Sequence, residues 1–532
     1  MQESIEVHDE ETMTEVNQAL AETASAAAAE RSRGRLRRVA LTLHRWAGLA
    51  AMLWLTVLGV TGLMLNHPEW RWIQQVTVTD VFASKHVLED EVRGTIVRKF
   101  QVNPTRPQEI LGGGQRGLWR SSDGGQHWSA VAYAGTNGTP RLFELVPGAG
   151  SPWRRLFLAT DDGIWQVNGA EGPAQFVALR GLHISYLAQG AEPLELVGAV
   201  GRSRPFRLRL DRPGEVVWLR AGDIDPKALP ESISLSRWMT DLHLGFGLAG
   251  GGWSRWINDY ASLALVVLSI TGFLLWLVPR QLRRRKATSN PERLRKVARW
   301  AFRGHAPVIG LLAVIPLLGL IVSGAYLNHV EALLKWSNQV RLDPLTLNAY
   351  GLNSLRDEIN GLAARPGQPA YLAVMTRMGI LETEDNGASW HYDASMPLPA
   401  HAKVGFIEMK NRQGHTFVGT HGGPNVYRID GESRWREIPG LRMMIQDAAL
   451  TDQGWIFKGS RGFYHAALSG GLAPLDIRPP DLPGLPVYNF INDLHSGMLF
   501  SKHWSYVNDI VCALALLMIA SGLINWWHRR WR

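Results

Sequence analysis

The sequence predicts an α-helical membrane protein that has four transmembrane helices, duplicated as two pairs, and an all-β, propeller-like domain on the exported side. Three observations predict this fold class. Four long windows are almost free of charged residues, the segments between them alternate short strand-like runs with Gly and Asp turns, and several short motifs occur twice. The mean hydropathy near zero therefore averages over two kinds of segment of opposite character.

Four apolar windows predict the membrane-spanning helices. Each window holds roughly 20 or more residues, enough to cross about 30 Å of hydrocarbon at about 1.5 Å per residue. A buried helix of a soluble protein rarely runs so long without a charge, so we favour the membrane interpretation. The windows are Leu41–Asn66, Asn258–Pro279, Ala306–Asn328 and Tyr506–Trp527.

Basic residues predict the topology. Arginines cluster before the first window, ten Lys and Arg residues lie from Arg280 to Arg303, and Arg529, Arg530 and Arg532 follow the fourth window. The positive-inside rule keeps such clusters in the cytoplasm. Both termini are therefore expected in the cytoplasm, and the two long intervening segments outside it. The net charge is +9, and the basic clusters that contribute to it alternate with the apolar windows. We therefore expect membrane lipid and no nucleic acid as a partner.

The windows and the charges set the predicted domain boundaries. The first 30 residues are acidic and then Ala-rich, without the pattern of a buried face, which predicts a disordered tail. The single cysteine, Cys512, lies inside the fourth window, so neither a disulfide within the chain nor a cysteine metal site is expected. The boundaries are a disordered cytoplasmic tail at 1–38, transmembrane helices at 39–67, 241–280, 305–329 and 491–528, exported β segments at 68–240 and 330–490, a basic cytoplasmic loop at 281–304 and a cytoplasmic C-terminus at 529–532.

Matched motifs predict that one unit occurs twice. The heptapeptide TGLMLNH ends at His67, and SGAYLNH ends at His329. Small residues let membrane helices approach closely, so the Thr-Gly and Ser-Gly pairs are expected to be packing points. Each unit then consists of a helix, an exported segment and a second helix. The other matched pairs are Thr240–His243 with Asn492–His495, Asn258-Asp259 with Asn508-Asp509, and Thr271-Gly272 with Ser521-Gly522.

Two turn motifs predict the fold of the exported segments. Residues 121–128 and 383–390 both fit Ser/Thr-x-Asp-x-Gly-x-x-Trp, which resembles the Asp-box turn of β-propeller blades. In such a turn the hydroxyl and the carboxylate bind turn amides, and glycine takes a positive φ. Each segment also holds three runs of strand, Gly turn and strand. One six-bladed propeller is favoured over two separate β domains, because a single ring leaves no open sheet edge.

Histidines at the ends of the windows are the candidate cofactor ligands. Of the 17 histidines, six lie at matched places in the two halves. Histidines from different membrane helices can hold haem iron from both faces, and an ionisable group at membrane depth indicates function. The alternative is an ordinary interfacial histidine, since water and headgroups are near. The six are His44 and His305 at the inner ends of the first and third windows, His67 and His329 at their outer ends, and His243 and His495 before the second and fourth windows.

Spacing limits how these histidines pair. His44 and His67 are 23 residues apart, about 35 Å on a straight helix, and two haems so far apart exchange electrons slowly. We predict one inner and one outer site, because electron flow across the membrane requires both. The arrangements left open are His67 with His243 and His329 with His495, or His44 with His305 and one of those outer pairs opposite.

Several stretches carry a family resemblance. Leu43–Gly48 (LHRWAG) opens the first window and Thr61-Gly62-Leu63 lies near its end, while Asp241-Leu242-His243 precedes the second window, which closes in Thr271–Trp276 (TGFLLW). In these residues the chain resembles the PepSY-associated transmembrane family, over the four windows and their flanks. At the third window, Gly304-His305-Ala306-Pro307 replaces the Leu-His-Arg opening and is one position out of register. Propeller-like repeats also replace the family's exported PepSY modules.

The resemblance implies a multi-pass protein of the bacterial inner membrane with a large periplasmic domain. Family members include iron-regulated inner-membrane proteins and siderophore-iron reductases that carry two haems across four helices. The resemblance therefore implies two haem b groups, a cytoplasmic or quinol electron donor, and a periplasmic acceptor that is a ferric chelate or a protein. The family's histidines correspond to His44, His243 and His495, and less closely to His67, His305 and His329.

The leading hypothesis is a haem-containing electron-transfer protein, with reduction of ferric siderophore or other iron as its expected activity. The alternative is a non-enzymatic, membrane-anchored propeller that binds or assembles a periplasmic partner. A sialidase-type hydrolase is disfavoured, because the Asp-box marks a fold and the sequence shows no convincing arginine triad with an acid and a nucleophile. A transporter is disfavoured, because no window carries Asp, Glu, Lys or Arg near its centre.

Overall fold

Two units with different secondary structure make up the chain. The helical unit comprises residues 1–60, 260–325 and 506–532, and the β unit comprises residues 61–259 and 326–505. The computed structural model describes residues 3–530, apart from 68–69, 71, 74–75, 80–95, 151, 222–223, 225–231, 250–252, 285–290, 344–353, 397–404, 413, 422–423, 433, 442, 460–461, 468–470, 482–483 and 502.

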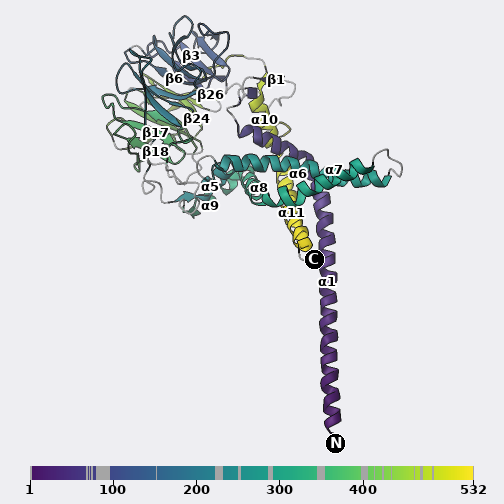
Figure 1. The fold of residues 1–532 in the computed structure, drawn as a ribbon. Helices are drawn as coiled ribbons and strands as arrows, with labels where there is room; N and C mark the ends of the chain where they lie inside the picture. The colour runs from purple at the N-terminus through teal and green to yellow at the C-terminus, as the bar shows by residue number, and fades with distance from the viewer. Residues whose placement is uncertain are drawn as a thin grey trace. The chain divides into compact units, whose positions relative to one another are not determined.

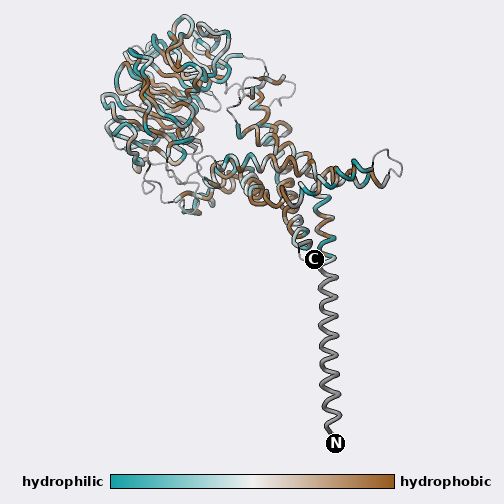
Figure 2. The backbone as a smooth tube through the Cα atoms, in the orientation of Figure 1, coloured by the Kyte–Doolittle hydropathy of each residue, from teal (hydrophilic) through white to brown (hydrophobic). Residues whose placement is uncertain are grey.

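Long helices characterise the helical unit (Figure 1), and long runs of their residues are hydrophobic (Figure 2). Within the described residues, three helical segments are long and apolar enough to cross a membrane, namely Gly34–Leu65, Trp253–Leu282 and Ser505–His528. Buried alanines such as Ala51 and Ala261 lie where these helices pack, because small side chains let helices approach closely. The elements are α1 (Glu3–Leu65), α6 (Trp253–Arg284), α7 (Pro291–Arg303), the π-helix η4 (Gly304–Gly310), α8 (Val314–Asn328) and α11 (Ser505–Arg530).

The third span differs from the predicted single helix at 305–329. A helix pair, Glu292–Gly310 and Val314–Asn328, has the apolar character of one span but is bent by 73°. In the described part of the chain, three of the four predicted helices are therefore continuous, and a fourth span is present only if this bent pair counts as one. Pro307 lies within η4, and proline has no amide proton for the α-helical ladder, which favours a change of hydrogen-bond pattern at this turn.

Two segments predicted to lack regular structure are helical. α1 begins at Glu3, within the range 1–38 for which a disordered tail was predicted. Ala, Glu and Arg have high helix propensity, and this composition is sufficient without a buried face. The predicted cytoplasmic loop at 281–304 contains the end of α6 and all of α7, whose first residue is proline, a favourable helix start. Residues 285–290 of that loop and Arg532 lie outside the described residues.

The two exported segments each supply three four-stranded antiparallel sheets. The sheets of the first are β2 (Lys99–Val102), β3 (Ile110–Gly114), β4 (Gly117–Ser121) and β5 (Ser129–Ala130); β6 (Leu142–Pro147), β7 (Leu156–Thr160), β8 (Gly163–Val167) and β9 (Gln175–Ala178); and β10 (Ile184–Gln189), β11 (Glu195–Val200), β12 (Arg204–Arg209) and β13 (Val216–Trp218). The sheets of the second are β16 (Gly361–Ala363), β17 (Leu372–Thr376), β18 (Gly379–Thr383) and β19 (His391–Tyr392); β20 (Gly405–Arg412), β21 (His415–His421), β22 (Val426–Ile429) and β23 (Arg436–Glu437); and β24 (Ile445–Thr451), β25 (Gly454–Gly459), β26 (Gly462–Ala467) and β27 (Leu472–Leu475).

These six sheets are the blades of one closed propeller (Figure 1). The innermost strands β2, β6, β10, β16, β20 and β24 contact one another in this order, and β24 contacts β2. Each predicted run of strand, Gly turn and strand forms the two middle strands of one blade. The single six-bladed propeller is therefore confirmed against two separate β domains, and the closed ring leaves no blade without a neighbour.

Two short antiparallel pairs join the segments where the chain enters and leaves the propeller. β1 (Thr77–Val78) pairs with β28 (Leu485–Pro486), and β14 (Ile233–Ser234) pairs with β15 (Arg341–Leu342). Each pair takes one strand from each exported segment. The helix α5 (Leu235–His243) follows β14, α9 (Val330–Ser337) precedes β15, and α10 (Val487–Ser496) follows β28. β14 and β28 thus place α5 and α10 at corresponding points of the two segments.

The two Asp-box turns have the predicted hydrogen bonds. Ser121 Oγ donates to Asp123 Oδ1 at 2.8 Å and accepts from the amide of Gly125 at 2.8 Å. In the second turn, Thr383 Oγ1 donates to Asp385 Oδ1 at 2.7 Å. Both boxes therefore close a β-hairpin by local side-chain bonds, as their sequence predicts.

Buried charged residues on the innermost strands pair with one another across blades. Lys99 and Lys410 both contact the Glu144 carboxylate, at 3.1 and 2.9 Å. Lys410 also pairs with Asp447, whose other oxygen accepts from the amide of Phe100 at 2.6 Å. Because a buried charge is costly unless it is paired, this network accounts for charged residues at the inner side of the blades.

Candidate functional site

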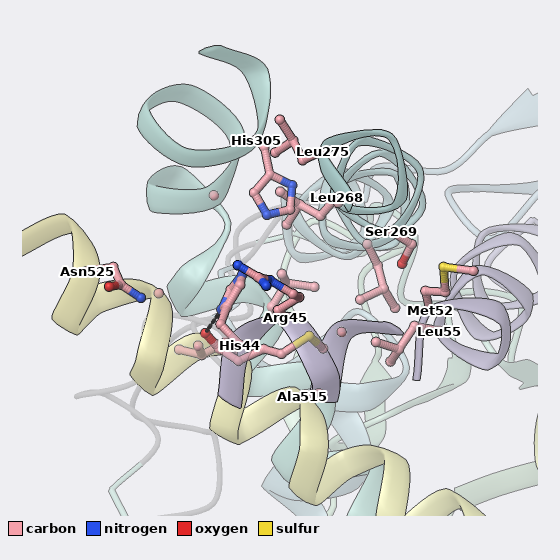
Figure 3. Close-up of a pocket in the computed structure, with 18 of the residues that line it drawn as sticks. His44, Arg45, Met52, Leu55, Leu268, Ser269, Leu275, His305, Ala515 and Asn525 are labelled. Atoms are coloured by element: carbon pink, nitrogen blue, oxygen red, sulfur yellow. Dashed lines mark hydrogen bonds between the residues drawn. The ribbon is translucent and has the colours of Figure 1, made fainter. Parts of the chain in front are cut away.

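The structure brings His44 and His305 together at one cavity of the helical unit (Figure 3). His44 lies on α1 and His305 on η4, and the two ring centroids are 6.1 Å apart with 89° between the ring planes. The cavity has a volume of about 590 Å³, and apolar side chains dominate its lining. A volume of this size is typical of cofactor and small-molecule pockets.

The hydrogen bonds of these two imidazoles fix which nitrogen faces a ligand. His44 Nδ1 lies 3.0 Å from the carbonyl oxygen of Met518, which can only accept, so Nδ1 carries the proton. His305 Nδ1 lies 2.9 Å from Thr271 Oγ1. The Thr271 hydroxyl donates to the Val267 carbonyl at 2.6 Å, and it therefore accepts from His305 Nδ1–H. Both histidines are left with an Nε2 lone pair, the form that ligates a metal.

Glycines make room beside both rings. A Cβ added at Gly272 would lie 3.3 Å from His305 Cε1, and one added at Gly522 would lie 3.5 Å from His44 Cε1. Gly272 follows Thr271 on α6, and Gly522 follows Ser521 on α11, so each helix presents a hydroxyl and a bare backbone to one imidazole. Side chains at these positions would narrow the cavity next to the histidines.

A second histidine pair lies in the β unit. His243 at the end of α5 and His495 on α10 have ring centroids 6.2 Å apart, with 54° between the ring planes. His495 Nδ1 contacts Thr61 Oγ1 at 2.8 Å. Asn258 Nδ2 donates to the carbonyls of Leu242 and His243 at 3.1 and 3.0 Å, and these bonds hold the end of α5 in place.

The outer pairing predicted from spacing differs from the observed one. The structure pairs His243 with His495, rather than with His67 and His329 respectively. His67 Nε2 contacts Asp259 at 3.1 Å, and its Nδ1 lies 3.2 Å from Arg255. His329 is the N-cap residue of α9. α5 and α10 bring together residues 252 positions apart, and spacing along one helix says nothing of such a pair.

The residues present fit a haem group at the inner pair, and the outer pair has a similar separation between its rings. Among the residues that the structure describes, no group of three or more His, Cys, Asp or Glu could hold a bare metal ion. A haem needs only two axial ligands, because the porphyrin supplies the others. Two imidazoles bound to one metal at about 2 Å per bond have ring centroids roughly 6 Å apart, and the observed values are 6.1 and 6.2 Å. Nδ1 donors, a mostly apolar cavity and the bare glycines are what such a group requires.

Sequence reasoning missed what the small residues do. The Thr-Gly and Ser-Gly pairs were expected to be packing points, but Thr61, Thr271 and Ser521 contact imidazole Nδ1 atoms. Thr and Ser can bind a histidine through the hydroxyl or can serve as small packing residues, and the sequence does not distinguish these two roles. The signal that could have found this role is that each matched pair holds a hydroxyl residue, although alanine would pack as well.

Fold and histidine pairs together define a membrane-associated protein that combines long apolar helices with a β-propeller. Two overlapping stretches, residues 18–278 and 201–529, match the model of the family described as the PepSY-associated TM region. These matches extend over most of the sequence, and the chain belongs to this family. No curated protein matches the chain.

Three solved structures with a limited similarity to this chain illustrate the comparison. They are Sqt1 from Chaetomium thermophilum (13% identity, 75% of this chain and 89% of that chain, TM-score 0.32), YCF48 from Cyanidioschyzon merolae (9%, 69% and 94%, 0.29) and an ancestral GH74 enzyme (8%, 73% and 38%, 0.32). This chain thus spans 38% of the GH74 enzyme. Similarity at these scores says nothing about function.

Proposed function

We propose that this protein binds two haem b groups and transfers electrons across the bacterial inner membrane to a periplasmic acceptor. The observation that carries the proposal is the His44–His305 pair, 6.1 Å between centroids, at an apolar cavity of about 590 Å³. The second pair, His243 with His495, supplies the outer site that transmembrane transfer requires. Haem bound at these pairs supplies one-electron redox chemistry.

The residues of this chain then have separate tasks. The four histidines offer Nε2 to iron, while Thr271 and Met518 hold the Nδ1 protons of His305 and His44. Apolar side chains around the inner cavity exclude water, which disfavours side reactions and adjusts the redox potential. Arg45 also lines this cavity and is suited to bind the carboxylates of a haem.

The direction of transfer follows from the charges. Arginines before residue 39 and after residue 528, and the basic residues of α7, favour cytoplasmic termini and a periplasmic propeller. Electrons then come from a cytoplasmic protein or a quinol. The acceptor is a ferric chelate, such as a ferric siderophore, or a periplasmic protein that docks on the propeller. Ferric reduction is the activity that the family resemblance favours.

The test is an absorption spectrum with haem quantification on the purified full chain. We expect a Soret band, the α and β bands of reduced bis-histidine haem, and two haem groups per chain. His44→Ala or His305→Ala should remove one haem, and His243→Ala or His495→Ala the other. His67→Ala and His329→Ala are the matched controls and should leave both. Colourless protein from haem-replete cells would contradict the proposal.

A second candidate is a membrane-anchored propeller that binds a periplasmic partner without electron transfer. The complete six-bladed ring favours it, because propellers present an extensive surface for partners. The same histidine variants discriminate the two candidates. If His44→Ala and His495→Ala leave the cellular function of the protein unchanged, the helices serve as an anchor only.

A further inference from the structure

Three of the four paired imidazoles share one kind of Nδ1 partner. His305 Nδ1 contacts Thr271 Oγ1 at 2.9 Å, and His44 Nδ1 contacts Ser521 Oγ at 3.1 Å. His495 Nδ1 contacts Thr61 Oγ1 at 2.8 Å. In every case the hydroxyl belongs to a Thr-Gly or Ser-Gly pair on a long apolar helix.

Two of these hydroxyls, those of Thr271 and Ser521, are placed so that they act as acceptors. Thr271 Oγ1 donates its proton to the Val267 carbonyl at 2.6 Å, and Ser521 Oγ donates to the Met518 carbonyl at 3.2 Å. A hydroxyl whose proton is used in this way presents its lone pairs to the imidazole N–H. Thr271, Ser521 and Thr61 are 2%, 3% and 4% exposed, so water cannot readily replace them.

We propose that Thr61, Thr271 and Ser521 are positioning residues that hold the paired histidines in the Nδ1–H tautomer and raise the basicity of Nε2. Partners of this kind orient a ligating imidazole and tune the metal that it binds. A more basic axial ligand favours oxidised iron, so each hydroxyl lowers the reduction potential of the haem at its pair. This inference rests on the proposed function and deepens it.

Both inner histidines have a backbone carbonyl beside the hydroxyl. His44 Nδ1 lies 3.0 Å from the Met518 carbonyl and 3.1 Å from Ser521 Oγ. His305 has Thr271 Oγ1 at 2.9 Å and a backbone hydrogen bond to Leu268. Removal of either hydroxyl therefore leaves its imidazole with a carbonyl acceptor. Thr271→Val and Ser521→Ala should each weaken the hydrogen bonding of their histidine without abolishing it.

The test is a redox titration of the haem-loaded full chain, with the midpoint potential of each haem as the readout. Thr271→Val should raise the potential of one haem by about 59 mV if its preference for the oxidised state falls tenfold. Ser521→Ala should also raise that potential, and Thr61→Val should raise only the potential of the other haem. Thr271→Ser restores the hydroxyl and should restore the potential.

Thr56→Val is the matched control. Thr56 Oγ1 donates to the Met52 carbonyl of its own helix at 2.7 Å, as Thr271 does to Val267, and no imidazole contact is described for it. The midpoint potentials of both haems in Thr56→Val should equal those of the unmodified protein. Loss of one haem in Thr271→Val with retention in Thr271→Ser would also support the proposal.

Two results would overturn the inference and leave the proposed function intact. One is an unchanged potential in Thr271→Val with both haems bound. The other is an equal shift in Thr271→Val and Thr271→Ser, which would indicate a packing effect. Absence of haem from the unmodified protein would instead contradict the proposed function itself, so the two failures are distinguishable.

Discussion

Lys458 is a lysine buried within the propeller, and its environment has a measurable consequence. The side chain is 0% exposed, and Nζ donates to the Gly459 carbonyl at 2.5 Å. Burial, together with the nearby positive charge of Arg98, lowers the pKa of Lys458 from 10.5 to about 8, although the Asp447 carboxylate acts in the opposite direction. The protonated form is therefore disfavoured in the folded state.

The sign of the pH dependence follows from that shift. Between pH 8 and 10.5 the unfolded chain binds this proton more tightly than the folded chain, so the free energy of unfolding rises with pH in this window. At about 1.4 kcal/mol per pKa unit, the burial penalty below pH 8 amounts to about 3 kcal/mol. We predict that Lys458→Met removes this pH dependence. The free energy of unfolding of the variant should exceed that of the unmodified protein by more at pH 7 than at pH 10.

The measurement is chemical unfolding of the full chain in detergent at pH 7 and at pH 10, followed by tryptophan fluorescence. Lys410→Met is the contrasting variant. Lys410 pairs with Glu144 and Asp447, so its removal leaves buried carboxylates without this cation and should destabilise at both pH values. A Lys458→Met variant with the same pH dependence as the unmodified protein would show that Lys458 is not the source of that dependence.

The sequence indicated which histidines lie at the inner ends of the helices, but it indicated only in part which histidines lie next to each other. His44 and His305 were expected at the same membrane level because both follow basic clusters. His243 meets His495 through two helices that begin after short strand pairs, and that geometry exists only in the folded chain. The role of Thr271 required knowledge of the neighbouring ring, which lies 34 positions away on another helix.

Among secondary-structure elements, the hairpins were predictable and the third span was not. A strand, Gly turn and strand are local, so the sequence alone specifies them. The offset of His305 by one position also has a local explanation. A π-helical turn takes up one more residue than an α-helical turn, and η4 contains His305. The offset of His305 is therefore a sign of the π-helical turn. A hydropathy average over some 20 residues does not detect a change of one position.

The Asp-box turns provide a test at the level of one element. Gly387 has φ of +85°, and a Cβ there would overlap the carbonyl oxygen of Arg220, next to β13 of the neighbouring blade. We predict that Gly387→Ala destabilises the propeller in two ways. The positive φ costs about 1–2 kcal/mol for a residue with a side chain, and the overlap adds about 1–3 kcal/mol.

Gly124 in the first box is the matched control for this prediction. It has φ of +76° but nothing within 4 Å of an added Cβ, so Gly124→Ala should lose only the first of these two contributions. Urea unfolding of the full chain, monitored by near-ultraviolet circular dichroism, gives both values. Equal losses in the two variants would show that the second turn has room to move away from Arg220.

For the whole molecule, the two exported segments depend on each other for a closed core. One apolar cluster joins Val197 of the third blade with Leu362 of the fourth, and another joins Phe100 of the first blade with Phe463 of the sixth. The β1–β28 and β14–β15 pairs also take one strand from each segment. Sequence patterns predicted the blades and favoured the ring, but these contacts between segments were beyond them.

The ring should therefore unfold as one cooperative unit. Trp390 is 1% exposed and belongs to the cluster between the third and fourth blades. Trp390→Ala should cost about 3–5 kcal/mol, whereas Val217→Ala, at a residue 59% exposed, should change stability by less than about 0.5 kcal/mol.

Hydrogen exchange with mass spectrometry along a urea series reports each blade separately. We expect Trp390→Ala to lower the urea midpoint of peptides from β3 and β4 as much as that of peptides from β17 and β18, because opening one seam removes the neighbours that every blade needs. If only the second segment shifted, the blades would form two cooperative units despite their closed arrangement.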